Sequence, residues 1–181
     1  MATLTNNTAT KWILDPSHSE LNFKVKHLMI ANVKGEFKTF NAEIDLVDDT
    51  HATIVANVDT TSVFTNNTDR DNHLKGVDFF DTDTYPAMTF TSTSLKKLDD
   101  DAYTLKGLLT IKDVSKEVTL NVEFGGINKD PWGNEKAGFA FETKINRSDW
   151  GLNWNAALET GGVLVSDEVK ISGDVQFVKK V

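Results

Sequence analysis

Apolar and polar residues alternate with a period of two along most of this chain. From Ser19 to His27, Leu21, Phe23 and Val25 share one face with the histidine, whereas an asparagine and two lysines share the other. Because successive side chains of a strand point to opposite sides, this pattern predicts a β-strand with one buried face. The same reasoning predicts eight strands, which cover residues 19–27, 33–47, 52–60, 87–98, 103–111, 118–124, 137–145 and 169–177.

The connections between these segments indicate how the strands are arranged. Most are short turns, whereas parallel strands need crossovers of a dozen or more residues. An antiparallel sheet with one apolar face per strand forms either a sandwich or a closed barrel. We therefore predict an all-β, eight-stranded antiparallel barrel, which is either filled by its own side chains or holds one small ligand. A parity change within 33–47 also predicts a β-bulge near Thr39.

The stretch from Thr68 to Pro86 interrupts the strand pattern. Thr68 or Asp69 can cap a short helix, because either side chain can accept a hydrogen bond from free backbone N–H groups. Tyr85 precedes a proline and is therefore steered toward extended backbone. We predict a short helical plug between strands 3 and 4, folded across one end of the barrel, with Phe79 and Phe80 pointing inward.

Length and composition limit the classes of function. A chain of 181 residues fits one domain, with residues 1–10 as a polar tail and 11–181 as the barrel. A net charge of -8 argues against nucleic acid, and no apolar run is long enough to span a membrane. The chain lacks cysteine, which excludes thiolate chemistry. The N-terminus does not resemble a signal peptide, so we expect the protein in the cytoplasm, or in the periplasm or secreted if a signal was removed.

The apolar faces of the strands supply the candidates for the barrel interior. In an arbitrary β-protein such residues fill a solid core more often than they line a ligand site. Two irregular segments, the plug and residues 147–167, add three aromatic candidates. The full set is Leu21, Phe23, Val25, Phe79, Phe80, Phe90, Leu109, Ile111, Val118, Leu120, Phe139, Phe141, Ile145, Trp150, Val169 and Ile171.

A few polar residues invite a chemical interpretation. His27 lies on an apolar face, either as a satisfied interior group or as a hydrogen-bonding partner for a ligand headgroup. The run from Asp69 to His73 could suggest acid–base or metal chemistry, but we favour Arg70 paired with carboxylates. We expect Arg147 to form a structural ion pair, for example with an aspartate of the plug. No metal site or catalytic residue is predicted, and no nucleotide fingerprint is present.

Five motifs then occur in order: WILDPSHSELNFKVKHL, VKGEF, RDNHLKGVDFFD followed by YP, GLLTIKDVSKEV and INRSDWGL. Together they closely resemble the YceI-like family of bacterial polyisoprenoid-binding, lipocalin-like barrel proteins. The resemblance extends over nearly the whole chain. It implies an eight-stranded antiparallel barrel with a long apolar tunnel, which takes a polyprenyl chain or a quinone tail as its bound ligand. It also implies homodimers.

This resemblance changes the interpretation of the interior candidates and of His27, which become predicted ligand contacts. The predicted function is non-catalytic binding, sequestration or transport of an isoprenoid-type lipid, with no other cofactor. Two alternatives remain open. One is an enzyme that acts on an apolar substrate with His27 or His73 as general base. The other is a stress-related structural module whose barrel is packed solid.

Overall fold

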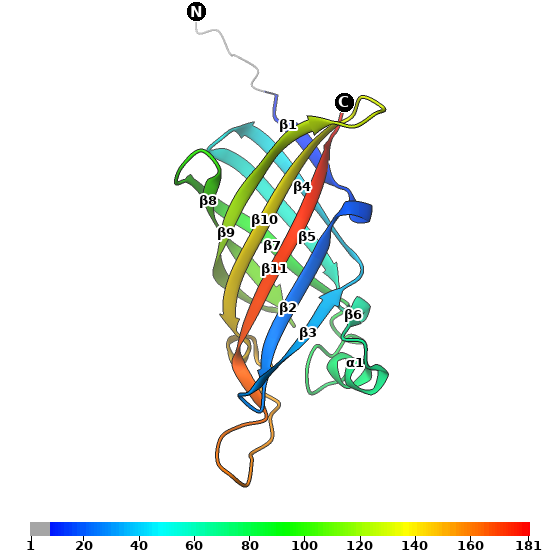
Figure 1. Cartoon of the computed structure of the whole chain (residues 1–181), viewed down its shortest axis with the longest axis vertical. Coiled ribbons are helices and arrows are strands. Elements are labelled where there is room, and N and C mark those ends of the chain that lie inside the picture. The colour runs from blue at the N-terminus through cyan, green and yellow to red at the C-terminus, as the bar shows by residue number, and fades with distance from the viewer. Residues whose placement is uncertain (1–7) are drawn as a thin grey trace, which may run out of the picture.

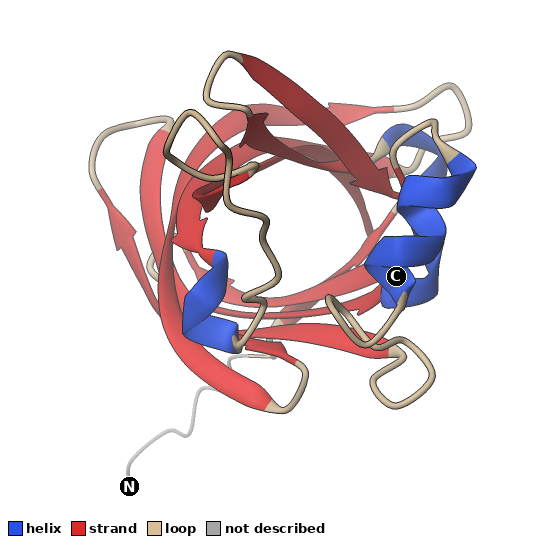
Figure 2. Cartoon of the chain, turned by 90° about the horizontal axis from the view of Figure 1, so that it is seen from below, coloured by secondary structure: helices blue, strands red, loops and turns tan. Residues whose placement is uncertain are grey.

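The computed structural model describes residues 8–181. Most of these residues form one antiparallel sheet that closes into a barrel (Figures 1 and 2). The strands are β1 (Thr10–Leu14), β2 (Glu20–His27), β3 (Ala31–Phe37), β4 (Phe40–Asp48), β5 (His51–Asp59), β6 (Val63–Phe64), β7 (Ala87–Lys97), β8 (Ala102–Ile111), β9 (Val114–Lys129), β10 (Glu135–Asn146) and β11 (Val165–Lys179). The helices are α1 (Thr68–Lys75) and the 3-10 turns η1 (Pro16–His18), η2 (Thr60–Ser62) and η3 (Arg147–Trp150).

The barrel has eight strand positions because two of its strands are interrupted. β1 and β2 both pair with β11, β1 over Phe177–Lys179 and β2 over Val165–Asp174. Opposite them, β4 pairs with β1 and β3 pairs with β2. The remaining order is β4-β5-β7-β8-β9-β10-β11, and β6 adds only two residues to the edge of β3. The predicted eight-stranded antiparallel barrel is therefore confirmed.

The parity change near Thr39 has a different cause from the one predicted. The strand breaks between β3 and β4, so the predicted bulge within one continuous strand is wrong. Lys38 and Thr39 lie between the two strands. Their N–H groups donate to the carbonyl oxygen and the Oγ of Ser62, at 3.1 and 3.0 Å. A backbone bonded to η2 instead of a neighbouring strand can change direction, which shifts the apolar residues to the other parity.

The sequence prediction also missed two features of strand length. Trp12 belongs to β1, a strand that was not predicted. Because β1 begins at Thr10, it also includes the last residue of the predicted polar tail. Residues 1–7 of that predicted tail lie outside the described residues. Gly125 and Gly126, which follow the predicted strand of residues 118–124, lie within β9, where the pairing with β10 shifts register. Gly126 has a φ of 110°, which only glycine adopts without strain.

The irregular segment after β6 is a short helix at one end of the barrel, here called the lower end (Figure 1). Asn67 caps α1 by accepting from the N–H of Arg70, so the predicted caps at Thr68 and Asp69 are wrong. Seen from below, α1 sits at the rim of the barrel (Figure 2). Phe79 and Phe80 follow it and pack against the apolar interior, as predicted, and the two rings contact Trp154 and Phe37.

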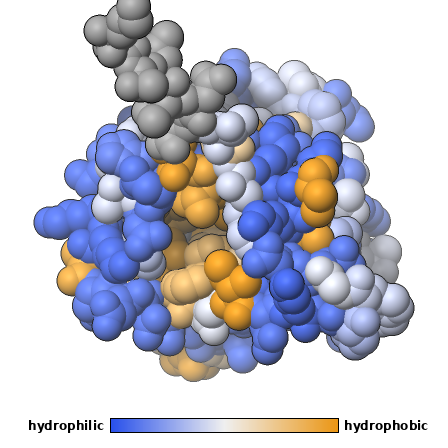
Figure 3. All heavy atoms as spheres, turned by 90° about the horizontal axis from the view of Figure 1, so that it is seen from above, coloured by the Kyte–Doolittle hydropathy of each residue, from blue (hydrophilic) through white to orange (hydrophobic). Residues whose placement is uncertain are grey.

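The interior contains two apolar clusters. The larger, toward the lower end, includes Phe37, Met88, Ile111, Ile145 and Trp150. The smaller surrounds Trp12 and Phe177 near the upper end, where β1 begins and β11 ends. Seen from above, apolar atoms are visible inside a ring of polar ones (Figure 3), so the apolar interior reaches the upper end.

Candidate ligand-binding cavity

A cavity of about 500 Å³ occupies the lower part of the barrel. Its walls come from β2, β3, the α1 segment and the first residues of β11, with contributions from β7, β8 and β10. The lining is overwhelmingly apolar. Its apolar members are Leu21, Phe23, Val25, Val33, Phe37, Leu74, Phe79, Phe80, Met88, Ile111, Ile145, Leu152, Trp154, Leu164, Val165, Val169 and Ile171.

The structure brings ten of the seventeen predicted ligand contacts together around this cavity. They come from the whole of β2, from the ends of β8 and β10, from the first half of β11 and from the segment after α1, which are far apart in the sequence. The ten are Leu21, Phe23, Val25, His27, Phe79, Phe80, Ile111, Ile145, Val169 and Ile171. The alternation of β2 and β11 places their inward residues here, since the pairs Phe23–Ile171 and Val25–Val169 lie directly opposite each other.

The other seven lie elsewhere in the barrel and do not line this cavity: Phe90, Leu109, Val118, Leu120, Phe139, Phe141 and Trp150. Phe90 and Phe141 lie across glycines of the neighbouring strands, Gly107 and Gly173, whose missing side chains leave room for the rings. The indole of Trp150 is buried and donates to the carbonyl oxygen of Leu109 at 3.0 Å.

Two of the remaining four, Leu109 and Val118, are buried in the lower cluster, and Leu120 packs against it. Phe139 belongs with the upper cluster and contacts the rings of Phe124 and Phe177. Position on the apolar face of a strand therefore marks an interior residue, but it does not distinguish a cavity wall from a packed core. That these seven residues contact a ligand stays a prediction.

Sequence reasoning missed the residues that close the lower wall. Leu152, Trp154, Leu164 and Val165 line the cavity, but they lie in or beside an irregular segment without periodicity. The ring of Trp154 lies 4.7 Å from that of His73, edge to face, and 5.5 Å from that of Phe79. The apolar character of Leu152 and Trp154 was the only signal available, and it could not give their position.

Arg147 holds this irregular segment in place. Its side chain is 6% exposed, and Nη1 donates to the carbonyl oxygens of Leu152 and Trp154 at 2.6 and 2.8 Å. Nε donates to the carbonyl oxygen of Ser166 at 3.0 Å. Burial lowers the pKa of the guanidinium, an effect that the Asp167 carboxylate opposes. The predicted ion pair with an aspartate of the plug is therefore wrong, because the guanidinium is bound by carbonyl groups of residues 152–166.

The polar residues of the cavity lie toward α1. Arg70 donates to the hydroxyl and the carbonyl oxygen of Thr65, both at 2.8 Å, so its predicted pairing with carboxylates is wrong. Nε2 of His73 lies 2.9 Å from Oδ2 of Asp78. His27 also lines the cavity, at the lower end of β2. Within residues 8–181, no three His, Asp or Glu side chains are grouped so that they could hold a metal ion.

The cavity opens at the lower end. Lys26, Asp69 and His73 line it and are at the same time exposed to solvent, which marks the mouth between β2 and α1. An apolar interior with a few polar groups at one opening suits a ligand with a hydrocarbon body and a small polar end. In the part of the chain that the structure describes, no helix has the length and hydropathy needed to cross a membrane.

Fold and cavity together define a lipocalin-like protein, a closed antiparallel barrel with an apolar interior. Residues 12–177 match the family model of the YceI-like domain. A UPF0312 protein of Staphylococcus epidermidis is 41% identical over 171 residues, which cover 93% of this chain and 97% of the relative. A UPF0312 protein of Staphylococcus aureus is 39% identical over the same shares. The chain therefore belongs to the YceI-like family.

Solved structures agree with this assignment. The YceI protein of Campylobacter jejuni has a TM-score of 0.74 and 38% identity, covering 86% of this chain and 90% of its own. BcnA of Burkholderia cenocepacia has a TM-score of 0.78 at 24% identity, covering 90% and 98%. A polyisoprenoid binding domain of Saccharophagus degradans has a TM-score of 0.66 at 17% identity, covering 93% and 98%. The last two likenesses show the shared fold.

Proposed function

We propose that this protein binds the hydrocarbon chain of an isoprenoid-type lipid, such as a polyprenyl chain or a quinone tail, and sequesters or carries it without chemical change. The observation that carries the proposal is the cavity of about 500 Å³ with its apolar walls. That volume falls within the range of about 300–1,000 Å³ that is typical of small-molecule sites.

The physical basis of binding is the removal of hydrocarbon from water. Each Å² of apolar surface that leaves water contributes about 25 cal/mol, so a chain needs no specific polar contact to bind tightly. Affinity is therefore expected to rise with chain length until the cavity is filled. A polar end of the ligand would lie at the mouth, near Lys26, Arg70 and His73.

The likeness in fold to a domain named as polyisoprenoid binding supports the choice of lipid. The alternative of a solid structural module has less support, since the lower part of the barrel is hollow. The alternative of an enzyme rests on His27 and His73. Of these, His73 is held by Asp78 and by two aromatic rings, an arrangement that also suits a purely structural role.

Native mass spectrometry of the protein, purified without detergent from its host, tests the proposal. We expect one lipid per barrel, and we expect prenyl alcohols of increasing length to bind with increasing affinity to the delipidated protein. Straight-chain alcohols of equal carbon number are the comparison, because they distinguish a preference for isoprenoid chains from binding that depends on hydrophobicity alone. A barrel that is consistently empty and takes up no prenyl chain would contradict the proposal.

Alanine replacement of His27 and His73 tests the absence of catalysis. If the protein only binds, both variants release the same lipid, chemically intact, that the unaltered protein releases. A product found with the unaltered protein but missing from either variant would instead support the enzyme.

A further inference from the structure

The turn between β2 and β3 presents three large aliphatic side chains to solvent. Leu28, Met29 and Ile30, here called the apolar tip, are 37%, 54% and 86% exposed. Isolated exposed apolar residues are ordinary, but three in succession at the end of a hairpin form a contiguous patch. Val163, 40% exposed, lies on the neighbouring loop.

The backbone of the apolar tip is unusual for these residue types. Leu28 and Met29 have φ values of 53° and 60°, in the left-handed region that asparagine and glycine occupy at much lower cost. A turn of Asn-Gly would give the same hairpin with less strain and better solubility. The chain thus keeps bulky aliphatic side chains at positions where neither the turn nor the barrel core requires them.

The apolar tip lies beside the mouth of the cavity. The N–H of Leu28 donates to the carbonyl oxygen of Leu164 at 2.8 Å, which joins the tip to the loop that forms the lower wall. His27 and Lys26, the residues before the tip, both line the cavity. In Figure 1 the β2–β3 hairpin and the loop before β11 both project from the lower end of the barrel.

The charge around the apolar tip differs in sign from that of the whole protein. Between Glu20 and Glu36 the hairpin contains three lysines and no acidic residue, in a chain of net charge -8. Lys24, Lys26 and Lys34 take part in no ion pair within residues 8–181. Lys24 and Lys34 even lie directly opposite each other, an arrangement that costs stability.

The acidic side chains at the start of the adjacent strand have partners of their own. Asp167 accepts from the N–H and the hydroxyl of Ser148, at 2.9 and 2.8 Å. Glu168 lies 3.6 Å from Nζ of Lys144. The lysines of the hairpin therefore remain available to an anionic partner outside the protein.

We propose that the apolar tip docks this barrel on an anionic lipid bilayer, with the mouth of the cavity facing the membrane. Leu28, Met29 and Ile30 enter the boundary between headgroups and acyl chains, while Lys24, Lys26 and Lys34 approach lipid phosphates. A lipid chain then passes between bilayer and cavity without crossing water. This passage rests on the proposed function, whereas docking itself depends only on the tip and the lysines.

Flotation of the full chain with vesicles tests docking. The vesicles are phosphatidylcholine alone, or phosphatidylcholine with phosphatidylglycerol in a ratio of about 3:1, and neither contains a prenyl lipid. We expect binding to the anionic vesicles that weakens with salt, since surface charges are screened beyond about 10 Å at 0.1 M salt. The double variant Leu28→Asn/Met29→Gly should lower the partition coefficient about tenfold or more, because it removes exposed aliphatic surface that would enter the bilayer. It should unfold at the same or a higher denaturant concentration, because it relieves the left-handed backbone of the turn.

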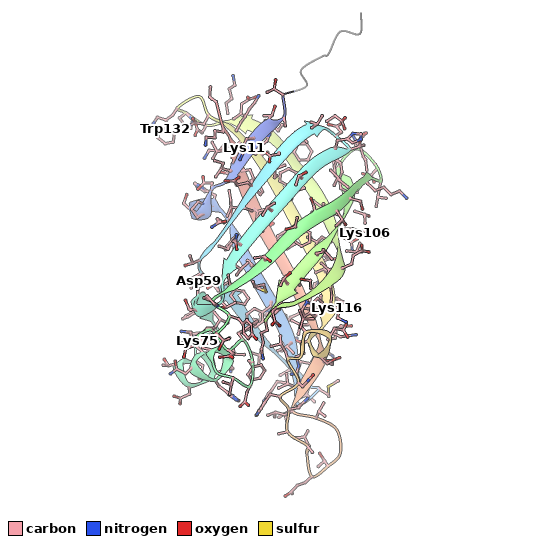
Figure 4. The ribbon with its side chains drawn as sticks, turned by 180° about the vertical axis from the view of Figure 1, so that it is seen from behind. Lys11, Asp59, Lys75, Lys106, Lys116 and Trp132 are labelled. Atoms are coloured by element: carbon pink, nitrogen blue, oxygen red, sulfur yellow. The ribbon has the colours of Figure 1, made fainter. Side chains whose placement is uncertain are left out.

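Two further variants complete the test. Lys24→Gln/Lys34→Gln should lower partition to the anionic vesicles about fivefold per lysine and leave partition to neutral vesicles unchanged. Trp132→Ser is the matched control, because Trp132 is 84% exposed at the opposite, upper end (Figure 4) and should not affect binding.

An unaltered protein that fails to float with either vesicle, or a tip variant that floats as well as the unaltered protein, overturns docking. Uptake of dispersed prenyl alcohol, measured in parallel, should be the same in the tip variant. If neither the unaltered protein nor any variant takes up prenyl alcohol, the result would count against the proposed function and not against docking.

Discussion

A Cβ atom at Gly173 would lie 2.5 Å from Cε1 of Phe141, so the phenylalanine ring fills the space that a side chain on β11 would need. The two residues lie directly opposite each other on β10 and β11. Phe23 lies directly opposite Gly35 in the same manner, whereas Phe90 pairs with Leu109 and its ring reaches over Gly107 diagonally. At these three places a phenylalanine ring occupies the space that a side chain on the neighbouring strand would need.

Replacement of Gly173 by alanine should therefore destabilise the barrel. The added methyl group meets the ring of Phe141 and the carbonyl oxygen of Glu20, and overpacking of this kind costs about 1–3 kcal/mol. Urea denaturation measures the loss. Gly138→Ala is the control, because no atom lies within 4 Å of its added Cβ. Equal stability of the two variants would show that the ring moves aside freely.

Enlarging a side chain of the cavity wall should reduce lipid uptake. Val169 lines the cavity, and Val169→Phe places an aromatic ring where the ligand chain is expected. We expect a loss of at least about tenfold in affinity for prenyl alcohol, because each CH₂ group denied burial costs about 0.8 kcal/mol. Val55→Phe, at an exposed position of β5, should bind normally. If a folded Val169→Phe variant binds as much prenyl alcohol as the unaltered protein, the ligand does not bind in this cavity.

Arg147 supports the lower wall, and its loss should loosen that wall before the rest of the barrel. In Arg147→Met the carbonyl oxygens of Leu152, Trp154 and Ser166 lose their donor. Each buried group left unpaired costs about 1–3 kcal/mol. Hydrogen exchange should accelerate in residues 152–166 more than in β8 or β9.

Arg70→Met serves as a comparison for Arg147→Met, since Arg70 is only half-buried and bonds to a single residue. It should have the smaller effect on stability. An unchanged exchange rate around Trp154 in Arg147→Met would mean that the irregular segment is held by its apolar contacts alone.

Asp15 should make the stability of the protein depend on pH in the acidic range. Its carboxylate accepts from Nζ of Lys136 at 2.8 Å and from Ser17 and His18, and these bonds hold the pKa of Asp15 far below its ordinary value. A depressed pKa in the folded state stabilises the fold above the unfolded pKa of about 3.9, and this contribution is lost as the pH falls below it.

Asp15→Asn should therefore be less stable than the unaltered protein at pH 7, and the difference should shrink as the pH is lowered from about 4 toward 2. Denaturant midpoints across this range measure the effect. Asp100→Asn, at an exposed turn, should show no such convergence. A difference between Asp15→Asn and the unaltered protein that is constant with pH would assign the loss to geometry and not to charge.

The strands could be predicted because a period of two repeats over many residues. The breaks could not, since the capping of Lys38 and Thr39 by Ser62 joins residues about two dozen positions apart. The cap of α1 was misplaced by one or two residues because Asn67, Thr68 and Asp69 can all accept a backbone N–H bond, and only the local backbone angles select one of them.

The interior residues followed from alternation as well, but their roles did not. Phe23 and Phe141 occupy equivalent inward positions opposite a glycine, yet only Phe23 lines the cavity. Trp154 was missed, although its ring contacts both His73 and Phe79, because no periodicity marks an irregular segment.

By itself the sequence determined an antiparallel barrel with an apolar interior, because the side of a strand that each residue faces depends only on its parity. The tertiary structure decided where that interior is hollow, which loop closes it and which hairpin stands at its mouth. These outcomes depend on the volumes of side chains that meet across strands and on hydrogen bonds such as those of Arg147, and neither is local in the sequence.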